Sequence, residues 1–95
     1  MNRLTKEQIL SERREADKEV TMLLQRAKSD YTLEDVRDAI YDETEQDDMT
    51  KIISMFDTGE GDVELGEILE LVIDAWNHFP HKMLGGKSPR EMDAA

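Results

Sequence analysis

The 95-residue sequence contains no cysteine. This absence excludes a disulfide framework, a thiolate zinc site and a cysteine nucleophile. Apolar runs are also short: none exceeds three residues, as in Leu71-Val72-Ile73, so we expect no segment that spans a bilayer. The opening residues Met1 to Glu7 lack the apolar stretch of a secretory signal. A cytoplasmic protein is therefore expected.

Proline and glycine are scarce, with two and five residues respectively, and most of them mark boundaries between elements. Gly59 and Gly61 indicate the end of one helix. A second helix must end before Pro80, because the residue before a proline disfavours helical backbone. No stretch alternates apolar and polar residues over five or more positions, so we expect no sheet.

Basic side chains are almost missing from the middle of the chain. Residues 30–74 carry sixteen acidic and two basic side chains, and the whole chain has a net charge of −11. This balance disfavours ordinary nucleic-acid binding, because phosphates must be met by Lys and Arg. It favours basic partners, cations or mimicry of nucleic acid, although a solvated helical surface explains it equally simply.

The clearest periodic stretch is residues 62–79, where apolar residues recur at three- and four-residue spacings typical of one helix face. They are Leu65, Ile68, Leu69, Val72, Ala75, Trp76 and Phe79. Leu71 and Ile73 widen this stripe, so we expect the helix to be buried over more than half its circumference.

Three further helices are predicted before it. The first spans about 5–28, with Thr5 as its cap and Gln8 completing a capping box. Its polar first half is expected to project from the core or to pack against a second subunit. The others span about 32–43, capped by Thr32, and about 45–57, and they could form one kinked helix. We predict an all-α fold: a single small four-helix domain over residues 1–95 with a short C-terminal helical hook.

Residues 57–67 resemble the calcium-binding loop of an EF-hand, with an acidic start, a central glycine and a closing glutamate. The resemblance gives four candidate cation ligands: Asp57, Glu60, Asp62 and Glu67. The loop is one residue short at an acidic ligand position. A glycine-rich turn followed by acids at a helix N-terminus explains the same residues without a metal, and we expect no cofactor.

A second acid–histidine group is Asp74, His78 and His81. Asp74 and His78 are four residues apart on the predicted helix and could share a divalent metal. A helix C-terminus with a packed or solvated histidine ring is the alternative. No nucleophile is placed beside a base at a recognisable spacing, so we predict no catalytic residue and no enzymatic activity.

The C-terminal segment Trp76–Met92 contains Asn77, Pro80-His81, Leu84-Gly85-Gly86, Ser88-Pro89 and Glu91. It resembles the segment that closes the catalytic domain of integrase-type transposases, which is also seen in small bacterial proteins. The resemblance covers this segment alone, because the chain has neither the strands nor the length of that domain. It implies a structural device: a helix ended by Pro80, a turn at Gly85-Gly86 and a capped final turn that folds back.

In that device Met83 and Leu84 are expected to cover Trp76 and Phe79. A short helix is predicted near 89–94, with Ser88 as its cap. The alternative is a binding loop with a basic surface formed by Lys82, Lys87 and Arg90. Among the methionines, Met22, Met49 and Met55 are expected to fill the core.

Together these features predict a small acidic protein of bacterial type that acts as a non-enzymatic interaction or regulatory module. A protein partner is expected, with no direct nucleic-acid or membrane contact, and a homodimer through the first helix is possible. Candidate contact residues are Asp38, Asp42, Glu45, Asp47 and Asp48, together with Lys82, Lys87 and Arg90. The alternatives are a divalent-cation-responsive protein and a nucleic-acid-linked protein of mobile elements.

Overall fold

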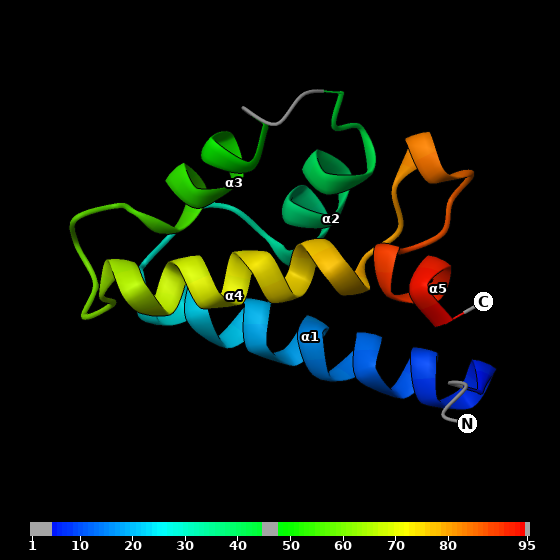
Figure 1. Cartoon of the computed structure of the whole chain (residues 1–95). Coiled ribbons are helices and arrows are strands. Elements are labelled where there is room, and N and C mark those ends of the chain that lie inside the picture. The colour runs from blue at the N-terminus through cyan, green and yellow to red at the C-terminus, as the bar shows by residue number, and fades with distance from the viewer. Residues whose placement is uncertain (1–4, 45–47, 95) are drawn as a thin grey trace.

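The predicted all-α fold is confirmed. The computed structural model describes residues 5–44 and 48–94, with side chains described as far as Met92. It contains the helices α1 (Lys6–Arg26), α2 (Leu33–Tyr41), α3 (Asp48–Phe56), α4 (Leu65–His78) and α5 (Pro89–Ala94), and a 3₁₀ turn (Lys82–Leu84). Figure 1 shows α1 and α4 side by side, with α2 and α3 together on one side of them.

Two predicted helix caps are present. At α1 the Gln8 amide donates to Thr5 Oγ1 (3.1 Å), and the Thr5 amide donates back to Gln8 Oε1 (2.9 Å). Thr32 and Asp35 form the same reciprocal pair at α2. Each box satisfies two of the amide donors that a helix start leaves without intrahelical partners. Residues 32–57 could have formed one kinked helix or two helices. The structure has two, with α2 ending at Tyr41 and α3 beginning at Asp48.

Helix α4 begins at Leu65 instead of the predicted Asp62. Its N-cap Glu64 makes no side-chain cap. Asp62 instead faces the end of α1, where its carboxylate lies 3.5 Å from Arg26 Nε and its carbonyl accepts from Arg26 Nη2 (3.3 Å). Asp62 thus joins the α3–α4 loop to α1.

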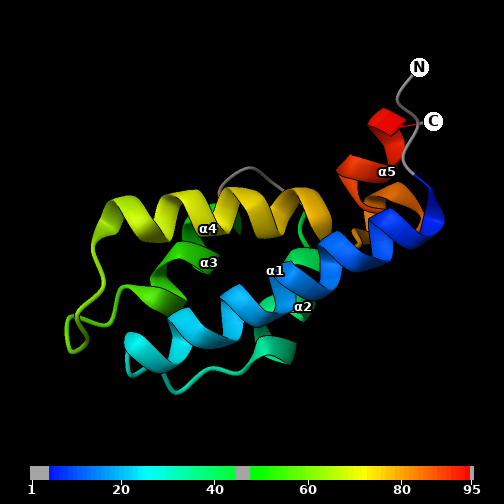
Figure 2. The same ribbon diagram turned by 90° about the horizontal axis from the view of Figure 1, so that it is seen from below.

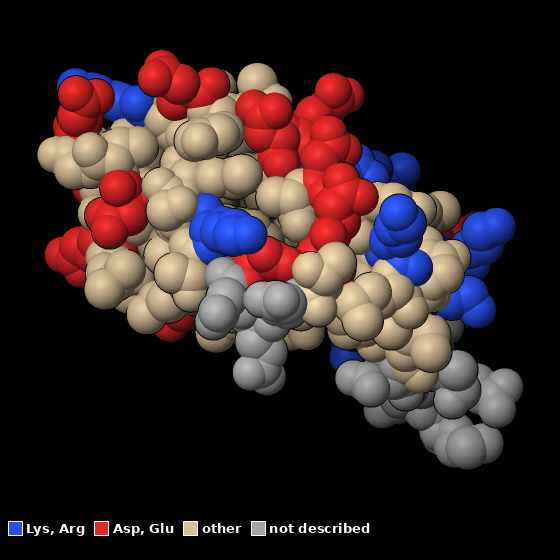
Figure 3. All heavy atoms as spheres, turned by 90° about the horizontal axis from the view of Figure 1, so that it is seen from above, with Lys and Arg blue, Asp and Glu red and all other residues tan. Residues whose placement is uncertain are grey.

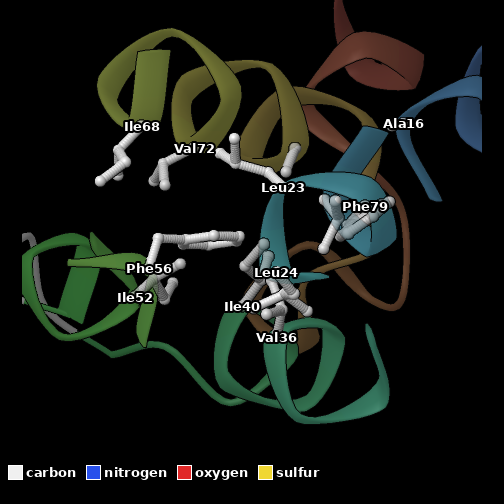
Figure 4. Packing of buried hydrophobic residues seen from close by; sticks show 12 residues of the cluster. Ala16, Leu23, Leu24, Val36, Ile40, Ile52, Phe56, Ile68, Val72 and Phe79 are labelled. Carbon is white, nitrogen blue, oxygen red and sulfur yellow. The ribbon is translucent and has the colours of Figure 1, made fainter. Parts of the chain in front are cut away.

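The core lies between the α1–α4 pair and the α2–α3 pair. Figure 4 shows Leu23 and Leu24 of α1, Ile40 of α2, Phe56 of α3 and Val72 of α4 pointing toward one another. All are at most 6% exposed. Met49 and Met55 pack against this cluster as predicted.

The predicted stripe of α4 is wider than the face that its neighbours cover. Ile68, Val72 and Ala75 are buried between α1 and α3, whereas Leu65, Leu69 and Ile73 are 55%, 40% and 52% exposed. We had expected more than half of the circumference of α4 to be buried. This was wrong, because the side that carries Leu65, Leu69 and Ile73 is exposed. The neighbouring helices cover only part of the circumference of α4, and the residues beyond that part stay in contact with water.

The first turns of α1 project from the core as expected, with Lys6, Glu7 and Gln8 exposed, but the residues that follow contact the C-terminal segment. In Figures 1 and 2 the C-terminal segment lies against the start of α1 and the end of α4. Arg13 of α1 forms an ion pair with Glu91, and Arg90 Nε lies 3.3 Å from Glu12 Oε2. The chain's own C-terminal segment therefore occupies part of the surface proposed above for a second subunit.

Within the described residues, no helix is both long enough and apolar enough to cross a membrane.

Candidate functional site

A groove of about 540 Å³ lies between α1 and α4. Figure 2 shows these two helices in front and diverging toward the α3–α4 loop. The groove is lined by Glu19, Met22, Leu23 and Arg26 of α1 and by Glu67, Glu70, Leu71 and Asp74 of α4. Each wall is thus a set of residues at positions i, i+3, i+4 and i+7, the spacing that places side chains along one helix face.

The floor of the groove is apolar. Leu23 is 6% exposed and belongs to the core, and Leu71 is half-buried against it. Met22 is 62% exposed, so its predicted role as core filler was wrong. It lies at the groove because Leu23 and Leu24, the two residues that follow it in the sequence, occupy the inward face of α1. An exposed methionine in such a place is adaptable to the shape of a partner.

The rims of the groove are acidic. Arg26 is its one cationic lining residue, and Arg26 Nη2 lies 3.1 Å from Glu67 Oε2 while Nε faces Asp62. In the described part of the chain no Lys or Arg forms an ion pair with Glu19, Glu70 or Asp74. An apolar floor with carboxylates along both walls is an arrangement that favours a partner with apolar and basic side chains.

A second acidic surface lies on the other side of the molecule. Asp38 and Asp42 of the predicted contact set are exposed on α2 and at its C-terminal end. Asp48 is half-buried in the first turn of α3, where its carboxylate accepts from the Thr44 amide (2.7 Å). Figure 3 shows many acidic side chains across this face, with basic ones in its middle, at the end that carries the hook and at the opposite end. Glu45 and Asp47 lie outside the described residues.

The three basic candidates are differently placed. Lys82 and Lys87 are exposed, whereas Arg90 is held by its ion pair with Glu12. A small hollow of about 390 Å³ near Arg90 is also lined by Glu12, Asn77 and His78. Arg90 thus belongs to a junction between α1, α4 and α5, whereas Lys82 and Lys87 remain exposed.

Residues 57–67 do not gather into a cation site. Asp57 and Glu60 are exposed, while Asp62 and Glu67 both face Arg26. Among the described residues no group of three or more acidic or histidine side chains could hold a metal ion.

Residues 57–67 instead make contacts that hold the α3–α4 loop against the end of α1. Thr58 Oγ1 donates to the Ala27 carbonyl (2.5 Å), and the Gly61 backbone lies directly against the end of α1. The glycine that the EF-hand resemblance placed at the centre of a cation loop is thus required by close backbone packing.

The two histidines are also separated. His78 Nδ1 lies 2.8 Å from the Asp74 carbonyl and Nε2 lies 3.3 Å from Glu12 Oε2. His81 is buried elsewhere, with Nε2 2.7 Å from the Trp76 carbonyl and Nδ1 3.4 Å from Glu43 Oε1. Asp74 Oδ1 lies 3.6 Å from His78 Nδ1, but His81 does not join them, so no described group of three completes the metal site considered for Asp74, His78 and His81.

The C-terminal hook adopts the predicted device. Gly85 and Gly86 have positive φ values of 68° and 84°, and the Ser88 amide and hydroxyl both donate to Glu91 Oε1 (3.0 Å each). Met83 is 65% exposed, so its predicted cover of Trp76 was wrong. The His81 ring takes this place, in an edge contact with Trp76 at 4.9 Å between ring centroids.

Glu91 is the residue that connects the hook to α1. Partial burial raises the pKa of its carboxyl, but the hydrogen bonds from Ser88 and the charge of Arg13 outweigh this and lower the pKa overall. Arg13 in turn donates through Nε to the His78 carbonyl at the end of α4 (3.0 Å). One guanidinium thus joins three helices.

Sequence reasoning missed the groove because it assigned Met22 and Leu71 to the core. The signal was present in the matched spacings of Glu19-Met22-Leu23-Arg26 and Glu67-Glu70-Leu71-Asp74. That these two sets face each other depends on the packing of α1 against α4.

Compared with models of protein families, with curated proteins and with solved structures, the chain matches none. The transposase-tail resemblance consequently stays a prediction.

Proposed function

We propose that this protein is a non-enzymatic module that binds another protein, and that the groove between α1 and α4 is its contact surface. The observation that supports this proposal is the combination of an apolar floor with acidic walls in a groove of about 540 Å³. Apolar contact area supplies affinity, and charged rims supply orientation and selectivity. The acidic face of α2 has exposed charge without a comparable apolar floor, so it ranks second as a contact surface.

The chemistry of the groove favours binding over catalysis. Its lining offers carboxylates, aliphatic side chains and a guanidinium that is already paired. None of these lining groups is a hydroxyl, imidazole or amine that a neighbouring base could activate as a nucleophile. We propose a cytoplasmic location, since a chain without cysteine draws no stability from an oxidising compartment.

Affinity capture from a cell lysate tests the proposal, with nuclease added to remove bridging nucleic acid. The bait proteins are the wild type, the groove variant Glu19→Lys/Glu70→Lys and the control Asp38→Lys/Asp42→Lys. Both variants change the net charge equally and replace exposed residues. We expect a defined protein to be retained by the wild type and the control and lost by the groove variant.

The other outcomes are equally informative. Retention by the groove variant would contradict the proposed contact surface. Loss with the Asp38→Lys/Asp42→Lys control alone would move the contact surface to α2. Recovery of no specific protein by the wild type would contradict the interaction module itself.

A further inference from the structure

We infer that the ligand of the α1–α4 groove is an amphipathic α-helix of the partner protein, about two to three turns long, with basic residues on both sides of its apolar face. This inference rests on the proposed function and specifies the chemistry of the partner.

The dimensions of the groove favour a helix. Its lining spans Glu19 to Arg26 on α1 and Glu67 to Asp74 on α4, which is about 10 Å, or two helical turns, at 1.5 Å per residue. Both walls therefore present helical ridges of the same length. A third helix packs between two such ridges by the ordinary ridges-into-grooves geometry, as in other helix-in-groove complexes.

The charges of the groove favour a basic ligand. Glu19 on one wall and Glu70 on the other make no ion pair with Lys or Arg within the described segments, Asp74 Oδ1 lies 3.6 Å from His78 Nδ1, and Arg26 is engaged by Glu67 at one end of the groove. A helix whose apolar residues contact Met22 and Leu71 would place its flanking residues beside these carboxylates. Lys or Arg at those flanks would form ion pairs at a partly desolvated rim, whereas Asp or Glu would be repelled.

A second copy of this chain does not have this chemistry. The chain carries a net charge of −11, so two copies repel each other. None of the helices that the structure describes has an excess of basic residues: α2 and α4 are acidic, and α1 contains five basic and five acidic side chains. The ligand is therefore a segment of a different protein.

The closing experiment uses displayed random peptides of about 16 residues, long enough for roughly four helical turns. The library is selected on the wild-type protein and counter-selected on Glu19→Lys/Glu70→Lys. We expect enriched sequences to carry a Lys and Arg excess, with apolar residues at i, i+3 or i+4 and i+7. An enriched peptide should bind the Glu19→Lys/Glu70→Lys variant about tenfold more weakly, because two attractions become two repulsions.

Three further measurements sharpen the result. A composition-matched peptide with scrambled order should bind much more weakly, since its apolar residues no longer share a face. Amide chemical-shift changes should centre on Met22 and Leu71. The variant Met22→Ser should weaken binding, whereas Leu69→Ser, on the exposed side of α4 away from the groove, should not.

The inference is overturned if the library yields no enriched family, if enriched peptides lack basic residues or helical spacing, or if their shifts map to α2. Equal binding of the scrambled peptide would also overturn it. In each case the proposed function is judged separately: it stands if lysate capture still depends on Glu19 and Glu70, and it fails if capture is indifferent to them.

Discussion

At the scale of single residues, Gly61 shows how a turn position is selected by close packing. A Cβ atom added at Gly61 would lie 2.1 Å from the Arg26 carbonyl oxygen and 2.5 Å from the Ala27 Cα. Both are backbone atoms at the end of α1, so they cannot move aside as a flexible side chain could. The contact fixes where the α3–α4 loop crosses α1, and hence how α4 enters the core.

Replacement of Gly61 should therefore destabilise the protein. We expect Gly61→Ala to lower the free energy of unfolding by about 2–3 kcal/mol, because overpacking against backbone forces the loop away from α1. Urea denaturation followed by circular dichroism measures this change. Gly66→Ala is the control: its Cβ meets no atom within 4 Å, so the better helix propensity of alanine should leave stability unchanged or raise it by up to about 1 kcal/mol. Equal effects at both glycines would contradict the packing role of Gly61.

The Glu91 carboxylate should make stability depend on pH. Its pKa is lower in the folded chain than its ordinary value, so folding favours the ionised form. The contribution is then complete above the pKa of the unfolded state and is lost as the pH falls through the folded pKa. This window lies below the usual glutamate value of about 4.3.

Glu91→Gln should lower the free energy of unfolding at neutral pH by about 1–3 kcal/mol, the range for a hydrogen-bonded charged group. The loss relative to wild type should shrink on acidification, as measured by urea denaturation between about pH 7 and pH 3. Glu60→Gln serves as control because Glu60 is exposed in the α3–α4 loop. A constant difference between Glu91→Gln and wild type over this range would exclude the carboxylate as the cause.

At the scale of elements, α4 has three kinds of surface. Ile68 and Val72 face the core, Leu71 and Asp74 line the groove, and Leu69 is exposed on the remaining side. One amphipathic pattern thus serves packing and a candidate binding surface together. The division arises because α1 and α3 approach α4 from different directions and leave the rest uncovered.

Substitutions along α4 should separate these surfaces. Ile68→Ala should cost about 2–5 kcal/mol of unfolding free energy, because it leaves a cavity beside a side chain that is 1% exposed. Leu69→Ala should cost less than about 1 kcal/mol, since leucine and alanine both favour helices and the site is partly solvated. Thermal and urea denaturation of the two variants give the comparison. Similar losses at both positions would show that Leu69 is covered in solution.

At the scale of the whole molecule, the acidic charge includes two separate surfaces. One is the groove between α1 and α4, and the other is the exposed face of α2. Figure 3 shows that the side of α2 and α3 is dominated by acidic side chains away from the hook. Like charges at this density repel one another across the folded chain.

Screening should therefore stabilise the fold. We expect the melting temperature to rise by a few degrees as NaCl is raised from about 0.01 to about 0.2 M, because the Debye length falls from about 30 Å to below 10 Å. The variant Glu19→Lys/Glu70→Lys/Asp38→Lys/Asp42→Lys, with less net charge, should respond less. A melting temperature that falls with salt in the wild type would show that attractive ion pairs outweigh the repulsion.

Much of the local structure follows from short stretches of sequence. The caps at Thr5, Thr32 and Ser88 and the positive-φ turn at Gly85-Gly86 were all predicted, whereas the start of α4 at Leu65 was not. Each predicted feature depends on hydrogen bonds or backbone geometry within a few residues, so the residue types and their spacing suffice to predict it. The all-α class follows from the same local signals together with helical periodicity.

The contacts between residues far apart in the sequence depend on how the helices pack. The ion pair of Arg13 with Glu91, the burial of His81 beside Trp76 and the exposure of Met22 follow from the directions in which helices pack. Periodicity gives the face of a helix but not the width of that face that neighbours will cover. The groove likewise depends on tertiary packing. Its two walls are separated in sequence and come together only when α4 packs antiparallel to α1.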